Sequence, residues 1–111
     1  MNMNRYLAAA LAAAAAFAAG HVTAADIDAG KKKAQEVCAA CHNMDGISTV
    51  PDYPKLAGQY PDYLAKALRD YKSGARKNPI MAGMAAGLTQ KDIDDVSAYF
   101  ASLPPVLSTR M

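Results

Sequence analysis

The stretch Val37-Cys38-Ala39-Ala40-Cys41-His42 brings two thiols and an imidazole together within this 111-residue chain. Thiols three positions apart on a helical turn can add to the two vinyl groups of one porphyrin, and the histidine that follows can bind the iron. The C-x-x-C-H spacing therefore predicts one haem c, attached covalently through Cys38 and Cys41, with His42 as an axial ligand of its iron.

Three other uses of the cysteine pair are open. A redox-active disulfide of the thioredoxin kind belongs to a strand-rich βαβ context, and no period-2 apolar pattern occurs here. A zinc site needs a fourth ligand, but residues 26–111 hold no Cys or His outside the motif. A structural disulfide beside a bystander histidine would leave the spacing unexplained. Haem attachment is the interpretation that uses all three side chains.

The N-terminal quarter of the chain has the pattern of a secretory signal. Arg5 precedes an apolar run from residue 7 to 19, and small residues follow at Val22-Thr23-Ala24 and Thr23-Ala24-Ala25. This pattern predicts a signal peptide over residues 1–25, cleaved near Ala24 or Ala25, and a periplasmic location. The run is shorter than the ~20 residues that span a bilayer, so we expect no stable membrane anchor.

Length and charge limit what residues 26–111 can be. A chain of this size is one small domain, and its limited core would benefit from a large cofactor. The whole chain carries 12 Lys and Arg against 10 Asp and Glu. This balance lacks the strong positive field of a dedicated nucleic-acid binder, so we expect no nucleic-acid partner.

Apolar periodicity predicts an all-α fold with three main helices, over residues 27–41, 61–73 and 90–102. Pro61 suits the first turn of the second helix, and Gly74 suits its end. Thr89 and Asp92 have the spacing of a capping box for the third. The intervening segments 43–59 and 75–88 are rich in Gly and Pro, and we expect them to be long loops. Ordered loops of this length in so small a domain indicate that they wrap around a bound group.

The chain resembles the class I cytochromes c of the small bacterial periplasmic monohaem type, and is similar to one haem domain of the dihaem periplasmic cytochromes c. The resemblance is carried by four stretches: 37–42, Pro54-Lys55-Leu56-Ala57-Gly58-Gln59, Gly74-Ala75-Arg76 and Met81-Ala82-Gly83-Met84-Ala85-Ala86-Gly87-Leu88-Thr89. It implies the small cytochrome c fold, with the helices and both loops wrapped around one covalently attached haem.

The candidates for the sixth iron ligand are methionines, because no second histidine remains after residue 25. Met44 is too close to His42 to reach the opposite haem face, and Met111 ends a tail. Spacing alone leaves Met81 and Met84 open. The resemblance implies Met81, which stands eight residues before the threonine that opens the last helix, with Met84 as the runner-up.

The resemblance also implies supporting roles around the haem. It places at Pro51, nine residues after His42, the carbonyl that orients the imidazole. It pairs Gly30 with Tyr99 where the first and last helices cross. Two further residues recur near the haem rim in related chains and could contact the propionates or simply face solvent: Gln59 and Arg76.

An iron with both axial positions filled by protein suits outer-sphere electron transfer. The expected function is therefore a periplasmic electron carrier of a respiratory chain and not an enzyme. The alternative is a haem enzyme or a gas- or peroxide-reactive sensor with a labile sixth ligand. A third possibility is the electron-entry subunit of one dedicated oxidoreductase.

Partners are implied by the resemblance. The donor would be a membrane quinol-oxidising complex or a dehydrogenase, and the acceptor a terminal oxidase or reductase. A basic rim could steer acidic partners, or its side chains could simply be solvated; the candidates are Lys55, Lys72, Arg76 and Lys77.

Overall fold

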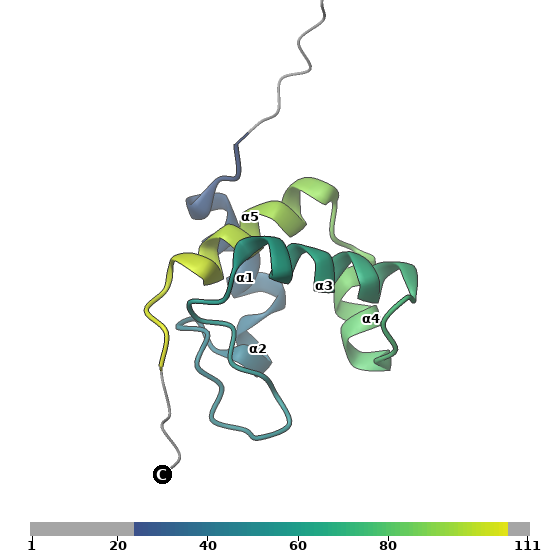
Figure 1. Ribbon diagram of the computed structural model, residues 1–111, viewed down its shortest axis with the longest axis horizontal. Coiled ribbons are helices and arrows are strands. Elements are labelled where there is room, and N and C mark those ends of the chain that lie inside the picture. Colours follow the sequence, from purple (N-terminus) through teal and green to yellow (C-terminus); the bar gives the residue numbers. More distant parts are fainter. Residues whose placement is uncertain (1–23, 107–111) are drawn as a thin grey trace, which may run out of the picture.

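The computed structural model describes residues 24–106, which form five helices and no strand (Figure 1). The helices are α1 (Ile27–Val37), α2 (Ala39–His42), α3 (Pro61–Ser73), α4 (Pro79–Ala86) and α5 (Gln90–Ser102). The predicted all-α class is confirmed. The predicted signal peptide lies almost wholly outside the described residues. Among residues 24–106, no helix is long and apolar enough to cross a membrane.

The helices α3 and α5 have the predicted bounds, because their ends are set by local sequence. Pro61 occupies the first turn of α3, and Gly74 ends it in the left-handed conformation with φ +83°. At the start of α5, Thr89 and Asp92 form the predicted capping box: each side chain accepts a hydrogen bond from the other residue's N–H, at 3.0 and 2.9 Å. This arrangement satisfies two otherwise free donors.

The first predicted helix is interrupted. Residues 27–41 were expected to form one helix, but α1 stops at Val37 and α2 resumes at Ala39. Cys38 stands at the junction, and its N–H still donates to the carbonyl of Ala34 at 2.8 Å. The break therefore lies inside the C-x-x-C-H motif and sets the direction in which α2 carries its histidine.

The helices α1 and α5 cross with their backbones in close approach at Gly30, which is buried. A Cβ atom at this position would lie 2.0 Å from the carbonyl oxygen of Asp95 and 3.1 Å from the Cβ atom of Tyr99. Only glycine fits without moving a helix. The predicted pairing of Gly30 with Tyr99 is thus confirmed.

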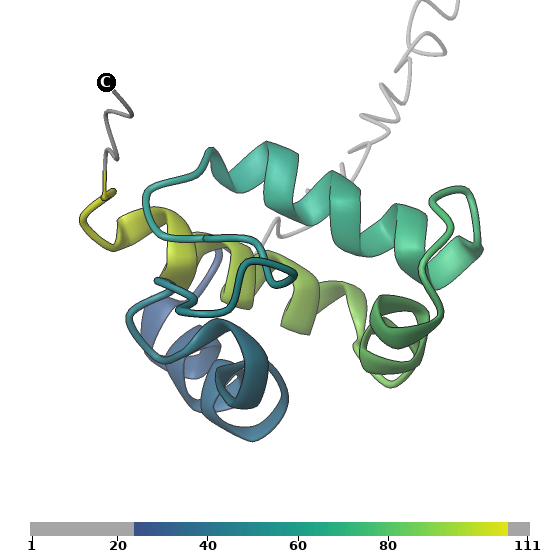
Figure 2. The same cartoon turned by 90° about the horizontal axis from the view of Figure 1, so that it is seen from below.

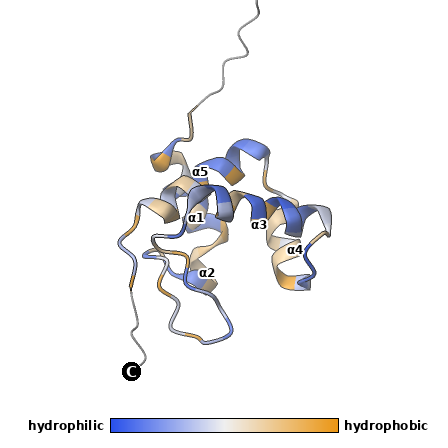
Figure 3. Cartoon of the chain, viewed as in Figure 1, coloured by the Kyte–Doolittle hydropathy of each residue, from blue (hydrophilic) through white to orange (hydrophobic). Residues whose placement is uncertain are grey.

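The segment 75–88 contains a helix where a loop was expected. Asn78 caps α4 by accepting hydrogen bonds from the N–H groups of Ile80 and Met81, each at 3.0 Å, and Pro79 fills the first turn. Hydrophobic colour covers most of α4 in Figure 3. The α4 sequence has no polar face opposite an apolar one. It therefore lacks the apolar periodicity from which α3 and α5 were predicted.

The loop 43–59 is held against α5 by hydrogen bonds. The hydroxyl of Tyr99 donates to the carbonyl of Met44 at 2.6 Å, and the N–H of Gly58 donates to the carbonyl of Phe100 at 3.0 Å. Gly46 turns the loop at φ +68°, where a Cβ atom would meet the backbone nitrogen of Ala57 at 2.8 Å. The last helix therefore fixes the path of the loop that follows the C-x-x-C-H motif.

Asp95 is a nearly buried carboxylate that joins α5 to the start of α1. Burial alone raises the pKa of Asp95, but the N–H of Asp26, at 2.8 Å, and the ammonium of Lys91, at 2.5 Å, outweigh it and hold this pKa below its ordinary value. That ordinary value is about 3.9. Asp95 therefore stabilises the fold above about pH 4, and the contribution disappears as the pH falls through the lower folded-state pKa.

We expect Asp95→Asn to lower the free energy of unfolding by about 1–3 kcal/mol at pH 7, because it weakens two hydrogen bonds to a buried charge. The difference between wild type and variant should shrink at pH 3. Asp94→Asn, at an exposed position on the same helix, is the control and should cost less than about 0.5 kcal/mol. Denaturant titrations at both pH values measure this, and equal losses from the two variants would contradict it.

Candidate functional site

The described residues enclose a cavity of about 520 Å³. The helices α2 and α4 lie apart from each other, and α3 and α5 run along the space between them (Figures 1 and 2). Most of the cavity wall is apolar. Among the helices, α3 supplies the most lining residues: Tyr63, Leu64, Ala67, Leu68 and Tyr71. The volume lies within the usual range for cofactor pockets, ≈ 300–1,000 Å³.

His42 lines this cavity from the end of α2 and is only 6% exposed. Its Nδ1 lies 2.8 Å from the carbonyl oxygen of Pro54. A carbonyl can only accept a hydrogen bond, so Nδ1 carries the proton and donates it. The other ring nitrogen, Nε2, is left with its lone pair. A histidine held in this way is prepared to bind a metal through Nε2.

The expectation that Pro51 orients His42 was wrong. The accepting carbonyl belongs to Pro54, twelve residues after the histidine, whereas Pro51 is exposed and does not line the cavity. The resemblance located the right kind of contact but the wrong proline, because Pro51 and Pro54 stand in the same loop. Which carbonyl faces the imidazole depends on the loop path that Gly46 and α5 determine.

Cys38 and Cys41 line the same cavity with thiols that are not joined in a disulfide. Both are half-buried. Burial raises the pKa of the Cys38 thiol to about 11, so the neutral form dominates at pH 7. Within residues 24–106, no three His, Cys, Asp or Glu side chains are grouped closely enough to hold a metal ion by themselves.

The two methionines left open by the spacing both line the cavity from α4. Met81 is half-buried, whereas Met84 is 45% exposed. Met44 does not line the cavity and packs against the core that includes Tyr99 and Phe100. Met111 lies outside the described residues. The more buried of the two methionines of α4 is thus the one that the resemblance implied.

Polar side chains gather at the outer parts of the cavity. Lys55, Gln59 and Arg76 line it, and the Arg76 guanidinium lies 4.8 Å from the centre of the Tyr71 ring. Lys72 does not line it and instead donates a hydrogen bond to the carbonyl of Leu88. Lys77 is also absent from the lining. Of the four residues expected at the basic rim, Lys55 and Arg76 line the cavity itself.

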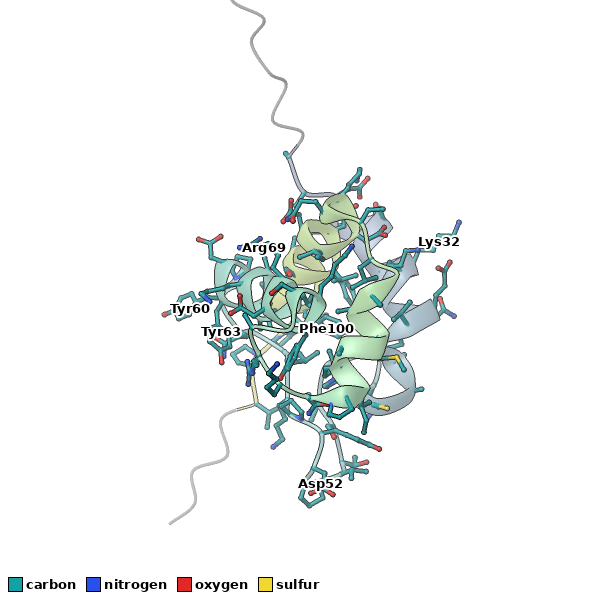
Figure 4. The ribbon with its side chains drawn as sticks, turned by 90° about the vertical axis from the view of Figure 1, so that its right-hand side faces the viewer. Lys32, Asp52, Tyr60, Tyr63, Arg69 and Phe100 are labelled. Carbon is teal, nitrogen blue, oxygen red and sulfur yellow. The ribbon has the colours of Figure 1, made fainter. Side chains whose placement is uncertain are left out.

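The lining residues fit a covalently attached haem. Apolar walls suit the porphyrin, two free thiols can bond its vinyl groups, and the imidazole nitrogen left free by Pro54 can bind iron. Figure 4 shows Phe100 within the molecule and Asp52 at its outer edge, so the apolar part of the site lies inside. Fold and site together define a small helical domain that holds a haem c.

Residues 27–104 match the cytochrome c family, and the chain belongs to that family. It is 47% identical over 89 residues to cytochrome c4 of Thiocapsa roseopersicina, which covers 77% of this chain and 46% of that protein. It is 42% identical over 82 residues to cytochrome c-554(548) of Halomonas halodenitrificans, covering 71% of this chain and 98% of that protein.

The fold of a solved relative also agrees. The crystal structure of reduced recombinant cytochrome c4 from Pseudomonas stutzeri matches with a TM-score of 0.68 and 43% sequence identity, covering 73% of this chain and 47% of that one. The chain spans about half the length of the cytochrome c4 relatives that it matches. The resemblance to one haem domain of a dihaem cytochrome is confirmed, and haem c is the cofactor that the family implies.

Proposed function

We propose that this protein is a periplasmic electron carrier that holds one haem c between His42 and Met81. The observation that carries the proposal is the His42–Pro54 hydrogen bond, which leaves Nε2 free in a cavity that Met81 also lines. When bound, haem c supplies an iron that accepts and releases one electron.

The side chains of the cavity would favour electron transfer over catalysis. The hydrogen bond from Nδ1 to Pro54 holds the His42 ring in one orientation, so Nε2 would hold the iron. The thioether of Met81 would be the second protein ligand and would raise the reduction potential relative to two nitrogen ligands. Apolar neighbours such as Leu64, Leu68 and Val96 exclude water and favour the less charged ferrous form.

Names of relatives support a role between redox proteins. One relative is the thiosulfate dehydrogenase electron acceptor of Stutzerimonas stutzeri, and another is the cytochrome subunit of sulfide dehydrogenase of Chlorobaculum tepidum. The proposed donors are accordingly a dehydrogenase or a membrane quinol-oxidising complex, with a terminal oxidase or reductase as acceptor. The proposed export signal over residues 1–25 would place the carrier in the periplasm.

Optical spectra and ligand binding test the proposal on purified holoprotein. We expect a far-red charge-transfer band from the oxidised protein, because a methionine sulfur bonds the ferric iron. The reduced protein should not bind carbon monoxide without denaturant and should exchange electrons with a soluble mediator in both directions. Rapid carbon monoxide binding by the native reduced protein would instead support the alternative, a reactive haem with a labile sixth ligand.

A further inference from the structure

Ser97 on α5 has a buried hydroxyl without a hydrogen-bond partner. The residue is 1% exposed, and its Oγ is the single buried side-chain polar atom within residues 24–106 that contacts no donor or acceptor. A serine inside a helix commonly donates to the carbonyl four residues earlier, but Ser97 does not. Since an unpaired buried hydroxyl is costly, its position requires an explanation.

The place of Ser97 in the fold explains why its hydroxyl is unpaired, because the residue lines the cavity. The helix α5 contributes three residues to that lining: Val96, Ser97 and Phe100. Ser97 is the polar member of this set, and two of the residues that α3 contributes to the same lining, Leu64 and Leu68, are apolar. No charged residue of α5 lines the cavity, so Ser97 is the polar residue of this helix beside the cavity, with its Oγ just beneath the accessible surface.

We propose that the Ser97 hydroxyl lowers the reduction potential of the haem by stabilising the ferric state. The inference rests on the proposed function, since it concerns the potential of the carrier. A hydroxyl that is not committed to a carbonyl can turn its oxygen toward added positive charge. Ferric iron carries one more positive charge than ferrous iron, and a dipole acts strongly in surroundings of low dielectric constant. Hydrogen bonding and polarity around a haem are established determinants of its potential.

Ser97→Ala removes the dipole and should raise the equilibrium constant for reduction about threefold. This corresponds to roughly 28 mV, at 59 mV per tenfold change for one electron. Ser97→Thr keeps the hydroxyl and should stay close to wild type. Ser102→Ala is the matched control: Ser102 is exposed near the end of α5, its hydroxyl bonds the carbonyl of Tyr99, and it does not line the cavity.

Spectroelectrochemical titration of the four holoproteins measures these potentials, and the far-red band reports whether the methionine ligand is intact. An unchanged or lower potential in Ser97→Ala would overturn the inference, as would an equal rise in Ser97→Thr or in Ser102→Ala. Folding does not limit the test, because alanine has the higher helix propensity and removes an unpaired polar group. If the Ser97 variants do not change the potential as expected, but the wild type still exchanges electrons and does not bind carbon monoxide, only this inference fails and the proposed function stands.

Discussion

Met81→Ala is expected to abolish the far-red charge-transfer band and to make the reduced protein bind carbon monoxide within seconds. The substitution removes the proposed sulfur ligand and leaves one axial position open. We also expect the reduction potential to fall by roughly 0.1–0.2 V, a part of the ≈ 0.8 V range that axial ligands govern. Absorption spectra of both oxidation states and a carbon monoxide titration provide the measurement.

Met84→Ala is the matched control because it removes the same side chain three residues later on α4. Met84 also lines the cavity, but 45% of it is exposed. Its loss should leave the band in place and cost less than about 1.5 kcal/mol of stability, since little buried surface disappears. If the two variants exchange phenotypes, Met84 is the ligand. If both keep the band, either the two sulfurs can replace each other or another methionine is the ligand, and the assignment to Met81 alone is wrong.

The helices α3 and α5 could be predicted because residues at their own ends determine where they start and stop. The bounds of α3 and α5 follow from Pro61, Gly74 and the Thr89–Asp92 capping box, each of which acts within one helical turn. The α4 helix carried a comparable signal in Asn78-Pro79, a cap followed by a proline at the first position. The apolar periodicity that normally accompanies such a signal was absent, because α4 is apolar on most sides.

Tertiary contacts account for what the sequence could not supply at the site. The choice between the carbonyls of Pro51 and Pro54 depends on the path of their loop. That loop is held by the Tyr99 hydroxyl and the Phe100 carbonyl, both more than forty residues away from their partners in the sequence. The absence of a partner for Ser97 is likewise a property of the folded chain, which buries its hydroxyl. The sequence alone could single out Cys38, Cys41 and His42, because all three lie within one short motif, and the structure places them in the lining of one cavity.

Replacing both Cys38 and Cys41 by alanine is expected to yield colourless protein without stable tertiary structure. Both thioether bonds are lost, so the haem is no longer attached. The cavity of about 520 Å³ would then lack its occupant. The apolar walls that surround the haem would then face water or have to collapse on each other. A small domain has only about 5–15 kcal/mol of stability in total, so we expect the native packing to be lost.

The protein is matured in a host able to attach haem. The result is then measured by mass spectrometry, Soret absorbance and circular dichroism. Ala39→Ser is the control, because it changes the same motif without removing a thiol, and it should keep the haem mass, the colour and the helical signal. A haem-free double variant with wild-type helicity and a cooperative unfolding transition would show that the five helices close without the cofactor. The loss of haem would then be separate from folding, and the internal cavity would have to collapse or be filled by water.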